Sequence, residues 1–470
     1  MLRRAIARAR ARRAWLGQWT PAFVLTLLAT ALTIFYSVAP HWYDMERYWL
    51  AWLGERILAG NFPHAAGPES PYDLGHPWMP VEWLYAVAVA WTRDKHVFLA
   101  FAALNGLAGA AILWWALGSC IARRVPGNVT FLVSASCFWP AVTRYELRAE
   151  AFGNAFVVAV LLWGEDGLKR WALLPLFAVW ANVHPSFAFG LLVVALQTVQ
   201  SVRRRDLAAG GVFAGCALAT LCTPFGLHLW QHVWETSHGW IGQVVPEWKP
   251  LFAAAPFAVL LLLVPFVSML ARLGIRKRTL PDWSLWPIAS LLALSSQRFL
   301  ILAAGVGSPA ACGLFRQRDV ALPRAIVWIG LFAVAGVVAS GSLGHVQQLA
   351  ASGTRDVDFG LFVTASSPPV IERTIDLRGK LVSCVPGWYC NPALYFGART
   401  LYDGRTEPFS AQRVRELSAS LNDPAILRKW PLDYAIVPPA DAGRLEADGS
   451  WREVTRSSVM VVFRRLPRGT

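Results

Sequence analysis

Apolar residues dominate the first 341 positions and gather in runs that short polar or basic segments separate. About 20 apolar residues cross a bilayer as a helix, although shorter helices occur inside bundles. The pattern predicts membrane-spanning helices at residues 19–39, 97–119, 128–143, 149–164, 171–183, 186–201, 207–222, 251–271, 283–296, 298–314 and 324–341.

The segment VEWLYAVAVAW, residues 81–91, is too short for an independent span, and we expect it to lie in the membrane interface. Lys and Arg collect on the cytoplasmic side of membrane proteins. If this segment does not cross, the amino-terminal arginines and every later basic cluster fall on that side; if it crosses, the later clusters move outside. We therefore predict about eleven spans, with residues 1–18 in the cytoplasm and the carboxyl terminus outside.

The pattern changes after residue 341. Short β-type runs such as KLVSCV, DYAIVP and SVMVVFRR are separated by turn signals, which is typical of strands. The expected fold is an all-α polytopic membrane bundle at residues 19–341, with a first outer loop at residues 40–96. A small α/β domain outside the cytoplasm follows at residues 342–470.

Composition supports the membrane assignment. The chain has 470 residues, of which 55% are hydrophobic and 16% charged, whereas soluble domains carry roughly 25% charge. The net charge of +15 comes from short clusters between apolar runs, so it indicates topology rather than nucleic-acid binding. The chain has no base-stacking module, zinc-ligand spacing or phosphate-binding glycine loop. We expect no nucleic-acid partner.

Three carboxylates of the first outer loop are candidate catalytic groups. Asp44 lies just beyond the first span, where it could accept a proton or bind a metal; the alternative is an amino-terminal helix cap in a solvated loop. Glu46 is two residues further, so on a helix it faces away by roughly 200°. It is expected to pair with an arginine or to face water. Glu82 follows where the loop returns to the interface.

Candidate substrate-binding residues lie at the ends of later apolar runs. Arg144 and Arg148 in TRYELRAE could hold a phosphate, because guanidinium groups present a planar fork of donors; the alternative is that they extend to the headgroups. His184 in WANVHPSF could bind a headgroup or be structural. Glu247 is either a loop acid or part of the site. Arg298 lies between two short runs and needs an anionic partner.

The order of these features resembles the GT-C superfamily of integral membrane glycosyltransferases. It is most similar to bacterial dolichyl-phosphate-mannose-protein mannosyltransferase-like membrane proteins. The similar segments cover most of the chain; they are the acid after the first span, ERILAGNFP, HPWMPVEWL, the arginine-containing second outer turn, WANVHPSF, the TPFG…PEW loop, and a tail with YDGR before a terminal W…VVFRR. Arg148-Ala149 and His184-Pro185 depart from the Arg-Pro and His-Gly pairs usual in such proteins.

The resemblance implies transfer of a hexose or pentose from a polyprenyl-phosphate lipid to an envelope glycan or protein, outside the cytoplasm. It implies location in the bacterial inner membrane, and it makes Asp44 the first-loop acid that such enzymes use as a base or metal ligand. The need for a divalent metal stays open. Two other classes remain as alternatives: a transporter or flippase for a lipid-linked glycan, and a non-catalytic envelope assembly protein.

Cys384 and Cys390, in CVPGWYC, are expected to form a disulfide. Five residues that include a proline and a glycine separate them, which permits a tight closed loop, and the space outside the cytoplasm is oxidising. The alternative is two free or separately buried thiols.

Overall fold

The structure is a computed structural model. It describes residues 17–39, 45–144, 146–239, 248–254, 259, 272–275, 280–317, 347, 350–351, 353–355, 358–360, 362–364, 367–420 and 423–467.

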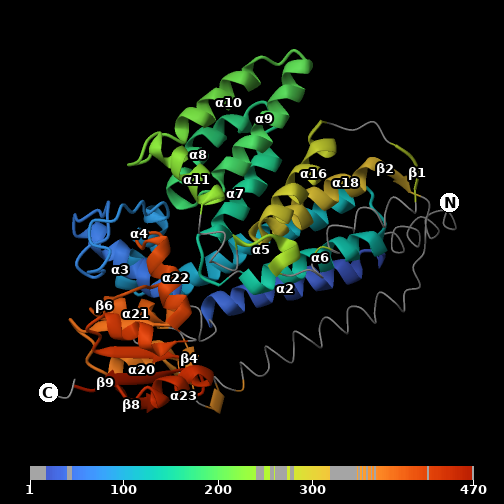
Figure 1. The fold of residues 1–470 in the computed structure, drawn as a ribbon. Coiled ribbons are helices and arrows are strands. Elements are labelled where there is room, and N and C mark those ends of the chain that lie inside the picture. The colour runs from blue at the N-terminus through green and yellow to red at the C-terminus, as the bar shows by residue number, and fades with distance from the viewer. Residues whose placement is uncertain are drawn as a thin grey trace.

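Helices make up most of the described chain before residue 318 (Figure 1). The bounds of the helices up to residue 163 are α2 Thr20–Val38, α3 Glu46–Leu58, α4 Trp83–Asp94, α5 Phe98–Ala122, α6 Gly127–Arg144 and α7 Glu150–Trp163. Those that follow are η1 Lys169–Ala172, α8 Leu173–Val183, α9 Phe187–Arg203, α10 Ala208–Ala219, α11 His228–His238, α13 Leu251–Ala254, α16 Leu280–Ser295, η4 Gln297–Phe299, α17 Leu300–Leu302, η5 Ala303–Gly307 and α18 Ser308–Leu314. A two-stranded sheet pairs β1 (Arg272–Ile275) with β2 (Phe315–Gln317).

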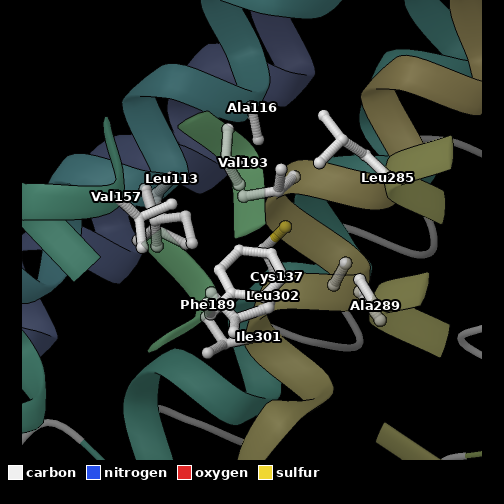
Figure 2. Packing of buried hydrophobic residues seen from close by; sticks show 14 of the residues in the cluster. Leu113, Ala116, Cys137, Val157, Phe189, Val193, Leu285, Ala289, Ile301 and Leu302 are labelled. Carbon is white, nitrogen blue, oxygen red and sulfur yellow. The ribbon is translucent and has the colours of Figure 1, made fainter. Parts of the chain in front are cut away.

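Apolar side chains from several helices meet in one core, which Figure 2 shows from close by. Leu113 of α5, Val157 of α7, Phe189 of α9 and Ile301 of α17 point into this cluster. Helices α2, α5 and α6 pack against one another, and α3 packs against α4. The α3–α4 contact needs Gly54, because a Cβ there would lie 2.1 Å from the carbonyl oxygen of Ala86. The core thus forms from the apolar runs of the sequence.

The prediction of eleven membrane spans is wrong. Within the described ranges, two helices are long and apolar enough to cross a membrane, α2 and α5. The other apolar helices found there, including α7, α9 and α10, have 10–17 residues. At 1.5 Å per residue they are shorter than the roughly 30 Å of a hydrocarbon core. Hydrophobic runs predicted where helices form, but not that each one spans a bilayer. The run expected at 324–341 lies outside the described residues, as do most of 251–271 and the expected domain boundary at 342.

The carboxyl-terminal part is built on a five-stranded mixed sheet, in the order β6-β5-β7-β9-β8. Strands β6, β5 and β7 are parallel, whereas β9 is antiparallel to both β7 and β8. The bounds are β3 Gly353–Arg355, β4 Phe362–Thr364, α20 Pro368–Thr374, β5 Leu381–Cys384, η6 Gly387–Tyr389, α21 Cys390–Tyr395, β6 Arg399–Thr400, α22 Ala411–Ser420, η7 Pro424–Lys429, β7 Tyr434–Val437, α23 Pro439–Ala447, β8 Trp451–Arg456 and β9 Val461–Arg465. We call residues 367–467 the sheet domain.

Both faces of this sheet are buried, which explains why β7 reads as an unbroken apolar run. Ala435 and Val437 pack on one face with α22 and α23, and Tyr434 and Ile436 pack on the other with α20 and α21. A disulfide joins Cys384, the last residue of β5, to Cys390, the first residue of α21, across a Cα–Cα distance of 5.4 Å. The bond fastens α21 to the sheet.

The sheet domain docks on the first loop and on α3 (Figure 1). One contact is the fully buried side chain of Arg405, whose Nη1 lies 3.1 Å from Glu69 Oε1 and whose Nη2 donates to Ser70 Oγ at 2.7 Å. The guanidinium carbon lies 4.8 Å from the ring centre of Trp52 and 5.3 Å from that of Trp78. We call this set the Arg405 anchor.

Candidate active site

Glu82 lies at the amino-terminal end of α4, where Pro80 ends the preceding loop and accepts a hydrogen bond from the backbone N–H of Trp83. Trp83 fixes this end of the helix, because its indole N–H donates to Asn182 Oδ1 at 2.8 Å. Asn182 in turn donates to the carbonyl of Cys222 at 2.8 Å. The side chain of Glu82 is mostly buried and keeps 22% of its surface exposed.

His184 faces Glu82 from the joint of α8 and α9. The backbone is extended at His184, which ends α8 before Pro185. The backbone N–H of Ser186 donates to His184 Nδ1 at 3.2 Å, so the neutral ring carries its proton on Nε2. His184 Nε2 lies 3.7 Å from Glu82 Oε1. The absence of a side chain at Gly153 permits this approach, since a Cβ there would lie 2.3 Å from Ser186 Oγ.

The charges of two arginines act on Glu82 and lower its pKa. Arg148, in the turn between α6 and α7, places Nη2 3.3 Å from Glu46 Oε1. Arg298, in η4, places Nη2 3.7 Å from Glu150 Oε2 and lies over the ring of Trp248, 4.6 Å from its centre. Both arginine side chains are about one-fifth exposed, so their donors remain within reach of a ligand. We call Glu46, Glu82, Arg148, Glu150, His184 and Arg298 the Glu82 cluster.

Burial and neighbouring charges raise the pKa of Glu82 to about 8. Burial is the largest cause, because it disfavours the charged carboxylate, and the negative charge of Glu46 acts in the same direction. Glu407 of the sheet domain also raises this pKa, whereas Arg298 and Arg148 lower it. A carboxyl group with this pKa can exchange a proton near neutral pH, which free glutamic acid cannot do efficiently.

The structure brings together five of the residues singled out from the sequence: Glu46, Glu82, Arg148, His184 and Arg298. Asp44 and Glu247 lie outside the described residues. The backbone of Arg144 ends α6, but its side chain is also outside the described part. Glu46 pairs with an arginine, one of the two arrangements expected for it.

Sequence reasoning missed Glu150, a member of this cluster, and Glu407, whose charge raises the pKa of Glu82. Glu150 stands two residues after Arg148 in TRYELRAE, and its nearly buried carboxylate faces Arg298. Glu407 is the second residue after YDGR, within a tail that the sequence did not connect to the site. Glu150 could have been predicted, because a charged residue at the end of an apolar run needs a partner. Glu407 could not, because its partner His232 is remote in the chain.

Within the residues that the structure describes, no three His, Cys, Asp or Glu side chains converge as metal ligands. Glu46 and Glu150 are each engaged by an arginine, which neutralises charge that a divalent cation would otherwise attract. The described residues therefore assign no metal to this cluster.

No family model matches the chain, and no curated protein matches it. The geometry of the Glu82 cluster therefore carries the functional conclusion.

Proposed function

We propose that the protein is a membrane glycosyltransferase that moves a sugar from a polyprenyl-phosphate donor to a cell-envelope acceptor. The observation that supports this most is the mostly buried carboxyl group of Glu82, which faces His184 and whose pKa the charges of Arg148 and Arg298 lower while burial raises it. The resemblance described above points the same way.

The cluster holds the groups that this reaction needs. The acceptor oxygen forms a bond to the anomeric carbon of the sugar, while the bond from that carbon to the phosphate oxygen breaks and its electron pair leaves with the lipid phosphate. Arg148 and Arg298 stabilise the charge on the departing phosphate. Glu82 takes the proton of the acceptor hydroxyl, and the ring of His184 faces its carboxylate.

Exposed apolar side chains support a membrane setting. Phe23, Val24 and Leu27 of α2 are 40–45% exposed, and Leu104 and Leu107 of α5 are 50–51% exposed. These two helices are the candidate membrane spans. Large apolar surfaces are costly in water and mark contact with lipid or another partner.

Replacing Arg298 or Arg148 with glutamine is expected to lower sugar transfer by about 100-fold or more, because leaving-group stabilisation contributes on this scale. The assay uses purified protein in lipid nanodiscs, polyprenyl-phosphate hexose or pentose labelled in the sugar, and an envelope fraction as acceptor. Label on the acceptor and free polyprenyl phosphate are measured together. Arg204→Gln, which changes an exposed arginine at the far end of α9, is the matched control.

A different result would identify another class of protein. If the lipid-linked sugar stays intact but crosses the bilayer of proteoliposomes in a protein-dependent way, the protein is a flippase. If neither transfer nor crossing occurs with any donor, the glycosyltransferase proposal fails.

Cys222 offers a test of which side of the membrane the site faces. It is the exposed thiol of this chain, since Cys120, Cys137, Cys216 and Cys312 are buried and the remaining two cysteines form the disulfide. Its carbonyl holds Asn182 beside Trp83, so it reports on the position of Glu82.

We expect a membrane-impermeant maleimide to label Cys222 in intact spheroplasts, because the proposed reaction takes place outside the cytoplasm. The Cys222→Ser variant should lose the label, as the control for specificity. Labelling that requires lysis would place the cluster on the cytoplasmic side.

A further inference from the structure

The sheet domain contains a cavity at the end where β5 and β7 begin and β9 ends. Lys380 comes directly before β5, Asp433 comes directly before β7, and Arg464 and Arg465 are the last two residues of β9. These chain ends meet because β5 and β7 are parallel and β9 is antiparallel to β7. The volume of the cavity is about 640 Å³, within the range of roughly 300 to 1,000 Å³ that is usual for ligand sites.

Positive charge dominates the lining of this cavity. The cationic side chains among its described lining residues are Lys380, Lys429, Arg464 and Arg465, and the acidic one is Asp433. Asp433 is engaged within the sheet, because its Oδ2 accepts a hydrogen bond from the backbone N–H of Leu381 at 2.8 Å. A cavity lined mainly by one sign of charge concentrates ligands of the opposite sign. We call these cations and the space between them the basic cavity.

Two of the cations are available to a ligand. Lys380 and Arg464 are exposed, and neither forms an ion pair with a described residue. Arg464 also lies directly opposite Arg452 of β8 in the sheet register. Like charges in such cross-strand positions destabilise a sheet. A bound anion would offset this repulsion.

Arg465 is already held in place. Its guanidinium donates a hydrogen bond to the carbonyl of Trp430 and lies over the ring of Trp451, 5.6 Å from its centre. A side chain that is fixed before binding loses little conformational freedom when a ligand arrives. Pro431 and Pro467 add apolar walls, which suit the C–H faces of a sugar ring.

The basic cavity stays open while the domain is docked. The β6 edge of the sheet faces the first loop, where the backbone N–H of Thr400 donates to the carbonyl of Glu69 at 2.7 Å. Strand β8 forms the opposite edge, away from the helices (Figure 1). Arg464 is next to β8 in the register, so docking on the first loop leaves it exposed.

We propose that the basic cavity binds an anionic saccharide, whose phosphate or carboxylate groups pair with Lys380 and Arg464. Lysine and arginine bind both groups through charge-assisted hydrogen bonds. A concave site accommodates a charged sugar, whereas the surface of a bilayer is too flat to enter it. The proposed function, on which this last step rests, makes that saccharide part of the acceptor. The acceptor is then an acidic envelope glycan that the sheet domain holds.

The test is calorimetric titration of the full-length protein in phosphatidylcholine nanodiscs with phosphorylated dextran, oligogalacturonate and uncharged dextran. We expect binding of an acidic saccharide that weakens roughly 10-fold or more when Lys380→Gln and Arg464→Gln are combined, since two ion pairs are lost. Lys169→Gln combined with Arg204→Gln is the matched control. It also removes one exposed lysine and one exposed arginine, but from the helical part of the chain, and should leave the affinity unchanged. Melting temperatures check that both double variants fold.

Unchanged affinity in the Lys380→Gln, Arg464→Gln variant would overturn the inference, and so would an equal loss in the control or equally tight binding of uncharged dextran. Attachment of phosphatidylglycerol vesicles without binding of either acidic saccharide would assign the cavity to lipid and reject the inference. The titration needs no turnover. Saccharide binding without sugar transfer would reject the proposed function and keep the site, whereas transfer without saccharide binding would reject the site alone.

Discussion

Replacing Glu82 with glutamine is expected to lower sugar transfer by about 100- to 10,000-fold, the range that a general base contributes. The amide keeps the shape and the contact with His184 but cannot accept the proton. In the natural protein only the deprotonated carboxylate acts as a base. The rate should therefore rise with pH toward a plateau above about 8, where Glu82 is ionised. The variant should lose this rising limb, as measured in the nanodisc assay over a range of pH.

Asp44→Asn and Glu46→Gln provide the comparison. Glu46 is engaged by Arg148, so its loss is expected to affect donor binding more than the rate at saturation. If Asp44→Asn abolishes transfer while Glu82→Gln remains active, the base is Asp44, as the resemblance implies. Loss in both variants would indicate that the two carboxylates share the reaction.

Glu82→Gln should also change the stability of the protein, and the sign of the change follows from the raised pKa of Glu82. Folding holds a proton on Glu82 that the unfolded chain releases near the ordinary glutamate pKa of 4.5. The contribution of Glu82 to stability is therefore present below that pH and is lost as pH rises through about 8. Glu82→Gln stays neutral at every pH, so its melting temperature should fall less between pH 5 and 8 than that of the natural protein, as measured by thermal unfolding.

Replacing Arg405 with glutamine is expected to weaken docking of the sheet domain by about 3 to 5 kcal/mol, the usual cost of removing one partner of a buried ion pair. Asp403 is fully buried, so it would lose the guanidinium that neutralises it. Trp52 and Trp78 would lose the cation that lies against their rings. Chemical denaturation followed by tryptophan fluorescence, together with limited proteolysis between the two parts, measures the effect.

Two further variants make this prediction specific. Arg405→Lys should not restore docking, because an ammonium group cannot bond Asp403 and Glu69 in a fork while stacking on two indoles. Arg415→Gln changes an exposed arginine on α22 and should leave docking unchanged. Normal docking in Arg405→Gln would show that the remaining contacts suffice, including Arg413 with Asp73.

Helix positions could be read from the sequence, because an apolar run of sufficient length buries its side chains as a helix. The run expected at 149–164 forms α7, and that at 186–201 forms α9. The further prediction that each of these helices crosses the membrane was wrong for most of the apolar runs. An apolar helix of 10–17 residues fits equally into a protein core, and hydropathy alone does not separate these two environments.

The candidate site could be predicted only in part. Charged residues at the ends of apolar runs, such as Arg148 and Arg298, stood out because a charge there needs a partner. The sequence did not show which carboxylate each of these arginines would contact. Arg298 meets Glu150, and Arg148 meets Glu46, across gaps of about 100 residues or more that local patterns do not bridge. The raised pKa of Glu82 depends on burial, which exists only after folding.

The sequence by itself determined the local features of this protein. Long apolar runs set where α2 and α5 form, and short β-type runs between turn signals set where strands such as β7 form. The tertiary structure alone decided that Glu82 meets His184, that Arg148 and Arg298 meet remote carboxylates, and that the sheet domain docks through Arg405 on Glu69. The physical reason is distance. Periodicity reports contacts a few residues apart, whereas charge pairing and burial depend on segments that meet only when the whole chain packs.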